Sequence, residues 1–360
     1  MTAFVDSCLD TLSTSANQVQ RSARPRAKKL LKVLAGKTNI LVTTHAHPDP
    51  DAVASCLGIQ QLLAAVMPGA RTTIRLKGQH DAPRIKGFTR VAHLEFEPWD
   101  DASLDTFDAI ILLDTQPSFS VSPLPDRVTP TVVIDHHRGR GRRSKVAFSD
   151  IRPDVGATAS IVFSYFMELQ VSIDATLAAA LLHAIESDLA GAAGQQSQLD
   201  TVAISGLLLV SDIRKLWQMR YVDLPASYYS AFARAINSAY RYDSAMIAHA
   251  GTVQQVEEAA MLADALLRSE GIGCVLVTAI HGERLILSLR SRIPRASGGE
   301  IMRRLVNKIG DGGGHRTKAG GQITLESAST ASVERVSKIL KRRLLRTLHI
   351  RSTRGVRFAA

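Results

Sequence analysis

The stretch HAHPDPD at residues 45–51 places two histidines and two aspartates within seven residues. Imidazole and carboxylate groups without thiolates favour Mn²⁺, with Mg²⁺ and Co²⁺ as alternatives. The apolar, β-branched segment NILVTT precedes this stretch, and apolar residues at helical spacing follow it. The pattern therefore predicts a loop between a buried strand and a helix, with metal-binding side chains at the end of the strand.

Two further apolar segments end in the same residue types. Asp114 closes FDAIILLD, and residues 135–137 (DHH) close TVVIDHH. In an open parallel sheet, the carboxyl ends of the strands form the crevice where ligands bind. Convergence of the three strand ends would gather His45, Asp49, Asp51, Asp114 and His136. These ligands exceed the needs of one ion, and two ions roughly 3.5–4 Å apart are the usual apparatus for attacking a phosphate ester.

Each motif alone has a simpler interpretation. An aspartate after an apolar strand, such as Asp114, is commonly a turn or helix N-cap residue. By itself, DHH is compatible with a hydrogen-bonded turn and HAHPDPD with an exposed loop. The combination of three strand ends with matching ligand types favours a metal centre.

The elements that must position these residues form an α/β pattern. Apolar segments at 39–46, 71–76, 107–115 and 131–137 predict parallel strands covered on both faces by helices. Residues 157–240 are predicted to be almost entirely helical, and strands and helices alternate again afterwards. We therefore expect two domains with a boundary near 240–247. The expected parts are a first domain at 1–240, a smaller α/β domain at 246–348 and a basic tail at 349–360.

Four motifs in order, HAHPDPDA, LLDTQP, VIDHH and GGGHRTKAGG, resemble those of the DHH phosphoesterase superfamily. The layout resembles the bacterial nanoRNase / 3′-phosphoadenosine-5′-phosphate phosphatase group, and the resemblance covers most of residues 38–325. DHH alone is a weak signal, whereas the four motifs in this order are specific. The resemblance implies a parallel-sheet DHH catalytic domain with a helical extension, followed by a smaller α/β DHH-associated domain.

The resemblance also implies roles for individual residues. His45 and Asp49 would bind a first divalent ion, and Asp114 would bridge both ions. Asp51, His136 and a further aspartate would hold the second ion. That aspartate is predicted to be Asp188 in HAIESDLAG, although Leu-Ala replaces the usual Thr-Gly after it, so a solvated acid at a helix end remains the alternative.

Three other polar residues near these motifs are assigned different roles. His137 would face the substrate phosphate, as a hydrogen-bond donor or as the proton source for the leaving group. Asp135 would orient a ligand histidine rather than bind metal. His47 stands where the family varies, so it is not expected to be a ligand.

The predicted second domain carries features suited to a phosphate. The glycines of GGGHRTKAGG let the backbone approach a ligand closely, and backbone amides there could cradle an anion. The residues expected to contact substrate are Arg290 and Arg292 of LSLRSR, Gly313, Gly314 and His315 of the glycine segment, and Arg138 of RGRGRRSK. A phosphate clamp of this kind would select short, end-bound substrates.

Composition restricts the classes of protein further. The 360 residues are 45% hydrophobic with a mean hydropathy of +0.03, as in ordinary globular proteins, and no apolar run is long enough for a membrane span. The three cysteines are scattered, which disfavours a disulfide framework and, with no secretory signal, predicts a cytoplasmic protein. The net charge is +11, but the nine Lys and Arg after Glu334 leave only +2 on the rest. That basic segment is interpreted as a solvated face, with an RNA-binding arm as the alternative.

These observations predict a two-metal phosphoesterase acting on a short nucleic acid or a nucleotide. The products would be 5′-mononucleotides from short oligonucleotides, or AMP from 3′-phosphoadenosine-5′-phosphate. An inorganic pyrophosphatase on the same core is one alternative, and a nucleic-acid-binding protein with a decayed metal site is another. Self-pairing is common in the family, so a homodimer is a further expectation.

Overall fold

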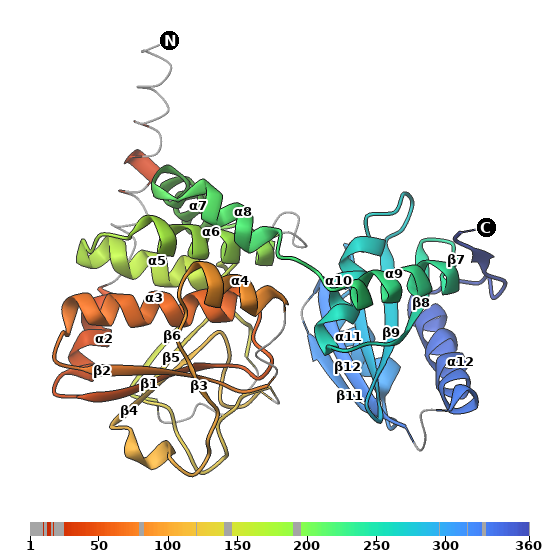
Figure 1. Ribbon diagram of the computed structural model, residues 1–360, viewed down its shortest axis with the longest axis horizontal. Helices are drawn as coiled ribbons and strands as arrows, with labels where there is room; N and C mark the ends of the chain where they lie inside the picture. Colours follow the sequence, from red (N-terminus) through yellow and green to blue (C-terminus); the bar gives the residue numbers. More distant parts are fainter. Residues whose placement is uncertain are drawn as a thin grey trace. The chain divides into compact units, whose positions relative to one another are not determined.

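The computed structural model describes residues 25–78, 83–119, 121–139, 146–189, 196–294, 296–314, 316–325 and 329–359, with residues 10, 13–15 and 17 near the start. The chain divides into two compact units, Met1–Val222 and Asp223–Ala360 (Figure 1). The sequence placed this boundary near 240–247. The structure places it earlier because the helix at 226–238 packs against the first long strand of the second unit.

The first unit has a parallel sheet and a large set of helices. Its strands are β1 (Asn39–Thr44), β2 (Arg71–Leu76), β3 (Glu97–Pro98), β4 (Ala109–Leu113), β5 (Val132–Asp135) and β6 (Phe148–Ile151). Its helices are α2 (Arg26–Leu34), α3 (Pro50–Val66), α4 (Pro83–Val91), η1 (Leu104–Thr106), α5 (Thr158–Leu169), α6 (Ala175–Leu189), α7 (Gln198–Val210) and α8 (Ile213–Arg220).

The six strands lie in the order β3-β2-β1-β4-β5-β6, and every neighbouring pair is parallel. After β1, the chain adds β2 and β3 on one side of it, and then adds β4, β5 and β6 on the other side. The point between β1 and β4 is where ligands bind in such sheets. The predicted strands and the α/β fold class are confirmed.

The two faces of this sheet are covered differently. On one face, α3 packs against β1, β2 and β4, and α5 and α6 pack against α3 in a further layer (Figure 1). On the other face, the described residues form a smaller cluster built from η1 and from loop residues such as Trp99, Phe107 and Val128. Among the described residues, α-helices cover only one of the two faces, so the expectation of helices on both faces holds for that face alone.

The second unit is built on a seven-stranded mixed sheet. Its strands are β7 (Tyr240–Tyr242), β8 (Ala245–Thr252), β9 (Cys274–His281), β10 (Arg284–Ser291), β11 (Asp311–Gly314), β12 (Lys318–Thr324) and β13 (Val356–Arg357). Its helices are α9 (Ala226–Ser238), α10 (Val256–Leu266), α11 (Gly298–Val306) and α12 (Thr330–Thr347).

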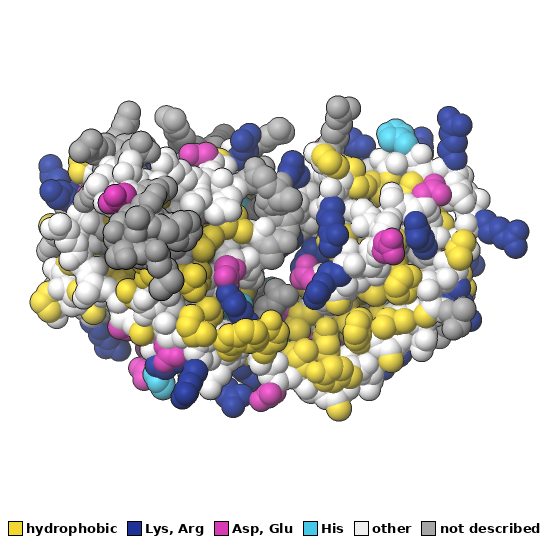
Figure 2. Space-filling view, turned by 90° about the horizontal axis from the view of Figure 1, so that it is seen from above, with side chains coloured by type: hydrophobic (Ala, Val, Ile, Leu, Met, Phe, Trp, Pro, Cys, Tyr) yellow, Lys and Arg dark blue, Asp and Glu magenta, His cyan; other side chains and the backbone are white. Residues whose placement is uncertain are grey.

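The strand order in this sheet is β11-β12-β10-β9-β8-β7-β13, and only β8 and β9 pair in parallel among these neighbours. Helices α9 and α10 cover one face, and α11 and α12 cover the other. The predicted basic tail is partly structured, because β13 pairs with β7 and extends the sheet. Lys and Arg side chains are spread over both units on the face shown in Figure 2. Among the described helices, none is long and apolar enough to cross a membrane.

Candidate metal centre

The ends of β1 and β4 bring a first group of ligands together. His45 follows β1, and Asp114 follows β4 directly. Nε2 of His45 lies 3.5 Å from Oδ2 of Asp114 and 3.9 Å from Oδ1 of Asp49. These three residues therefore meet at the point between β1 and β4 where ligands are expected.

Local backbone structure fixes the two carboxylates of this group. Asp49 is the N-cap of α3, where its Oδ1 accepts a hydrogen bond of 3.1 Å from the amide of Ala52. Asp114 has a φ of +55°, a left-handed conformation that is uncommon outside glycine. Its amide donates to the carbonyl of Ile134 on β5 at 2.9 Å. Such uncommon conformations cluster at functional sites, and the metal-bridging role of Asp114 stays a prediction.

A second group forms around His136, which follows β5. Its Nε2 lies 3.3 Å from Oδ2 of Asp188, 3.5 Å from Oδ1 of Asp114 and 4.0 Å from Oδ2 of Asp51. Its Nδ1 lies 3.2 Å from the carbonyl of Val155. Donation from Nδ1 to that carbonyl directs the lone pair of Nε2 toward the carboxylates, as in many metal-ligating histidines. Asp188, at the end of α6, is thus brought to the place where the sequence predicted it.

The N-terminus of α5 supports this group, which the sequence analysis did not predict. Asp51 is only 1% exposed, and its two oxygens accept hydrogen bonds from the amides of Thr158 (2.7 Å) and Ala159 (2.8 Å). The Thr158 hydroxyl donates to Oδ1 of Asp114 at 2.8 Å. The positive end of the helix dipole stabilises the Asp51 carboxylate. In the sequence, the small residues of GATAS (156–160) are compatible with the start of a helix. Nothing in this segment indicates which carboxylates its backbone amides contact.

The loop before α5 is held by a buried acid from α7. Asp200 is fully buried, and its Oδ2 accepts hydrogen bonds from the amides of Gly156 and Ser197, both at 2.8 Å. A Cβ at Gly156 would lie 2.4 Å from the Leu189 side chain, so a larger residue would displace the loop. This loop carries the Val155 carbonyl that orients His136.

The remaining DHH residues form a hydrogen-bonded pair with a third partner. Nδ1 of His137 lies 2.5 Å from Oδ1 of Asp135, which also accepts from the His137 amide at 3.1 Å. The side-chain amide of Gln116 donates to the other Asp135 oxygen at 2.8 Å and to the His137 carbonyl at 2.9 Å. In this structure, Asp135 orients His137. Gln116 lies in the LLDTQP motif but was not singled out from the sequence.

The charges of the site shift the pKa values of its members. Burial alone would lower the pKa of His45, but Asp114 and Asp49 raise it well above its ordinary value. Burial raises the pKa of Asp51, and repulsion from Asp114, Asp188 and Asp49 adds to the shift.

The histidines after β5 follow the same pattern. Burial would lower the pKa of His136 and of His137, but nearby carboxylates raise both. For His136 these are chiefly Asp114 and Asp188, and for His137 chiefly its hydrogen bond to Asp135. A cluster that draws protons onto its imidazoles would also attract a divalent cation, which displaces those protons on binding.

Three sets of side chains place their ligand atoms within 4.8 Å of one another. They are His45, Asp49 and Asp114; Asp51, His136 and Asp188; and Asp114, His136 and His137. Neither Asp51 nor Asp114 is ion-paired with Lys or Arg among the described residues. Buried carboxylates without a cationic side chain suit a metal ion, so these donors fit two divalent ions that share Asp114. His47 belongs to none of the three sets.

The residues predicted to contact substrate lie in both units. Arg138 is exposed directly after His137 in the first unit. Gly313 and Gly314 form part of β11, the edge strand of the second sheet. Arg292 is exposed after β10, and His315 lies outside the described residues.

Arg290 has a partner that the sequence did not predict. Its side chain points toward α10, where Nε lies 2.5 Å from Oδ1 of Asp264, and Nη2 lies 3.2 Å from Oδ2. This ion pair competes with the phosphate contact expected of Arg290, so that contact stays a prediction.

Comparison with known proteins finds a family model that matches part of the first unit. Residues 39–185 match the model of the DHH family, N-terminal domain. Over these residues, the chain is similar to the DHH family. The matched DHH domain contains both strand ends of the first ligand group and the DHH motif itself.

The chain is also similar to several curated proteins. An uncharacterised protein of Methanocaldococcus jannaschii is 31% identical over 291 residues, which are 80% of this chain and 59% of the relative. The cyclic-di-AMP phosphodiesterase PdeA of Listeria monocytogenes is 25% identical over 90% of this chain and 51% of its own length. A protein named "Probable manganese-dependent inorganic pyrophosphatase" of Lactiplantibacillus plantarum is 26% identical over 48% of this chain and 55% of its own. The chain thus spans little more than half of each relative.

Among solved structures, the crystal structure of an exopolyphosphatase-related protein from Bacteroides fragilis has a similar fold. It superposes with a TM-score of 0.70 at 16% identity, covering 90% of this chain and 96% of that one. At this identity the similarity supports the fold alone.

The hydroxyl of Thr158 offers a test of the α5 support. Thr158→Val keeps the shape of the side chain but removes the donor to Asp114, so we expect Mn²⁺ to bind about 10–100-fold more weakly. Isothermal titration calorimetry with Mn²⁺ measures this change. Thr158→Ser keeps the hydroxyl and should bind nearly as the parent protein does. A loss in Thr158→Ser but not in Thr158→Val would show that the methyl group, rather than the hydrogen bond, matters.

Proposed function

We propose that this protein is a metal-dependent phosphoesterase of the DHH type that cleaves short oligonucleotides or linear dinucleotides to 5′-mononucleotides. Hydrolysis of 3′-phosphoadenosine-5′-phosphate to AMP belongs to the same proposal. The observation that carries it is the pair of ligand groups that share Asp114 at the ends of β1, β4 and β5. Two bound divalent ions, Mn²⁺ being favoured, would activate water and stabilise the charge on the phosphate.

The protein's own residues would perform the remaining steps. Asp135 accepts the hydrogen bond from Nδ1 of His137, which fixes the ring and leaves Nε2 to act on the substrate. The raised pKa of His137 favours its protonated form, which can donate a proton to the leaving oxygen. Gln116 holds the carbonyl of His137 and so limits movement of the DHH segment. Arg138, exposed beside His137, would contact a phosphate oxygen.

Two observations favour a nucleotide substrate over pyrophosphate. The relative named as a cyclic-di-AMP phosphodiesterase matches 90% of the chain, whereas the relative named as a pyrophosphatase leaves about half of it without a counterpart. The second unit also presents the glycine strand β11, whose backbone can approach a substrate closely. Pyrophosphate hydrolysis remains the second candidate because of the manganese-dependent relative.

Hydrolysis of a substrate panel in the presence of Mn²⁺ tests the proposal. The panel contains a 5′-phosphorylated RNA dinucleotide, linear di-AMP, a 24-mer RNA, 3′-phosphoadenosine-5′-phosphate and pyrophosphate. We expect cleavage of the short nucleotides and not of the 24-mer, and loss of cleavage in Asp114→Ala. Rapid release of phosphate from pyrophosphate alone would favour the second candidate. No hydrolysis of any compound by metal-loaded protein would support a protein that only binds its ligand.

A further inference from the structure

The second unit contains a hollow that is separate from its glycine strand. It has a volume of about 150 Å³ and lies over β7, β8 and β9, beneath α12. In the sheet order, β10 and β12 separate these strands from β11. The hollow is therefore near the opposite edge of the sheet from Gly313 and Gly314.

A histidine with a defined hydrogen bond lines this hollow. Nδ1 of His249 on β8 lies 2.9 Å from Oγ1 of Thr278 on β9. The Thr278 hydroxyl itself donates to the Ala248 carbonyl at 3.4 Å, so its oxygen accepts the proton of His249 Nδ1. Nε2 is then the acceptor of the ring. Burial lowers the pKa of His249, which keeps the ring neutral near pH 7.

Aromatic and apolar side chains form the walls. Tyr240 and Tyr242 are alternate residues of β7, so both side chains lie on the same face of the sheet. Tyr240 is 41% exposed, whereas the Tyr242 ring is buried beneath Gly355, where a Cβ would lie 2.6 Å from ring atom Cζ. Leu276 of β9, which pairs with Ile247 of β8, contributes an apolar surface.

The side of the hollow formed by α12 is basic. Ser337 lines the hollow, and Lys341, one helical turn later, places Nζ 5.7 Å from the centre of the Tyr242 ring. Lys338 and Arg342 are exposed on the same helix. No acidic residue follows Glu334 in the sequence, so the segment after it carries only positive formal charges.

We propose that this hollow binds the base of a nucleotide, with the attached phosphate directed toward Lys341. Drug-sized ligands occupy roughly 300–1,000 Å³, so the space admits one flat ring system rather than a whole nucleotide. Tyr240, which is 41% exposed, offers a stacking surface, and the acceptor at His249 Nε2 suits the amino group of a base. Stacking on aromatic side chains beside basic residues is the usual way to hold single-stranded nucleic acid.

Binding measured without divalent metal tests this site independently of hydrolysis. The full chain in EDTA is titrated into a fluorescein-labelled hexa-adenylate RNA, and fluorescence anisotropy gives the affinity. Ser337→Phe fills the hollow from a half-buried helix position, and we expect it to weaken binding by about tenfold or more. Circular dichroism and the unfolding temperature must be unchanged in this variant. Binding as tight as that of the parent protein would overturn the proposal.

A charge-matched pair distinguishes the hollow from a merely basic helix. Lys341→Ala and Arg342→Ala each remove one positive charge from α12, but only Lys341 contacts the hollow's tyrosine. We expect Lys341→Ala to weaken binding several-fold more than Arg342→Ala. Equal effects would mean that the helix attracts the RNA by charge alone, and the proposal would fail.

Competition identifies the source of the base. Displacement of the RNA by AMP but not by inorganic phosphate supports recognition of the base, and displacement by both equally contradicts it. If AMP displaces the RNA at a concentration close to that of the RNA itself, the ligand is a free nucleotide. If displacement needs a much higher concentration of AMP, the ligand is the end of a nucleic-acid strand. Photo-crosslinking of a 4-thiouridine strand should label the peptide that contains Tyr240 and Tyr242.

Discussion

Replacement of Asp114 by Asn is expected to reduce phosphoester hydrolysis by about 10³-fold or more. One carboxylate oxygen of Asp114 lies 3.5 Å from His45 and the other lies 3.5 Å from His136, so this side chain belongs to both ligand groups. Metal ions contribute several kcal/mol of transition-state stabilisation, and each 1.36 kcal/mol corresponds to a factor of ten in rate. Loss of the shared charge should therefore not be recovered by raising the Mn²⁺ concentration.

The same variant should lose the stabilisation that Mn²⁺ gives to the folded protein. A ligand that binds only the folded state stabilises it by about 2.7 kcal/mol at a hundred times its dissociation constant. We expect Mn²⁺ to raise the unfolding temperature of the parent protein in a thermal scan, and to leave that of Asp114→Asn almost unchanged.

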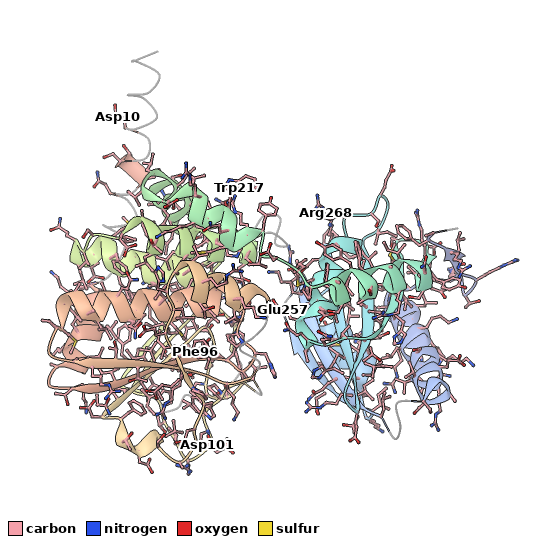
Figure 3. The ribbon with its side chains drawn as sticks, viewed as in Figure 1. Asp10, Phe96, Asp101, Trp217, Glu257 and Arg268 are labelled. Carbon is pink, nitrogen blue, oxygen red and sulfur yellow. The ribbon has the colours of Figure 1, made fainter. Side chains whose placement is uncertain are left out.

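Asp101→Asn is the matched control for Asp114→Asn. Asp101 is an exposed aspartate of the first unit, labelled in Figure 3, and its carboxylate accepts a hydrogen bond from Trp99. It belongs to none of the three ligand sets, so its replacement should keep both activity and the response to Mn²⁺. An Asp114→Asn protein that retains a tenth of the parent's activity would contradict the shared role of this carboxylate.

The positions of the strand ends could be predicted from the sequence because they depend on local patterns. The segments before His45, Asp114 and Asp135 are mostly apolar and β-branched, without a polar residue at every second position, as is typical of buried parallel strands, and the structure has a strand at each. Once the sheet is parallel, its geometry alone brings the residues at these ends together. This part of the site needed no knowledge of distant contacts.

The support around the metal centre depends on contacts between distant parts of the chain. Thr158 lies 107 residues after Asp51, and only the packing of α5 against α3 brings them together. Asp200 stabilises Gly156 from α7 in the same way. Neither contact leaves a periodic signal, so sequence patterns could not reveal them.

The direction of Arg290 was also beyond the sequence pattern. Alternate residues of a strand share one face, but the alternation does not say which neighbouring helix covers that face. In the structure, α10 covers it and supplies Asp264 as a partner. The short edge strand β13 was missed for a related reason, because two residues carry too little pattern to predict a strand.

The second large effect is expected from Asp188, the residue whose surrounding sequence departs from the family pattern. Its Oδ2 lies 3.3 Å from Nε2 of His136, although Leu189 follows where the family has threonine. We expect Asp188→Asn to weaken one of two Mn²⁺ sites and to lower activity by about 100-fold at limiting Mn²⁺, because it removes one anionic ligand. Unlike Asp114, Asp188 belongs to one ligand group, so high Mn²⁺ concentrations should restore much of the rate.

Glu186 provides the matched control on the same helix. Residues two apart on a helix point about 200° apart, and Glu186 accordingly pairs with Arg220 of α8 rather than facing His136. Glu186→Gln removes one carboxylate charge two residues away and should change the Mn²⁺ dependence of activity little. If Asp188→Asn and Glu186→Gln give the same Mn²⁺ dependence, Asp188 is a solvated acid at a helix end, and the second ion lacks this ligand. A shift confined to Asp188→Asn means that the carboxylate alone, without the family's following Thr-Gly, is enough to complete the site.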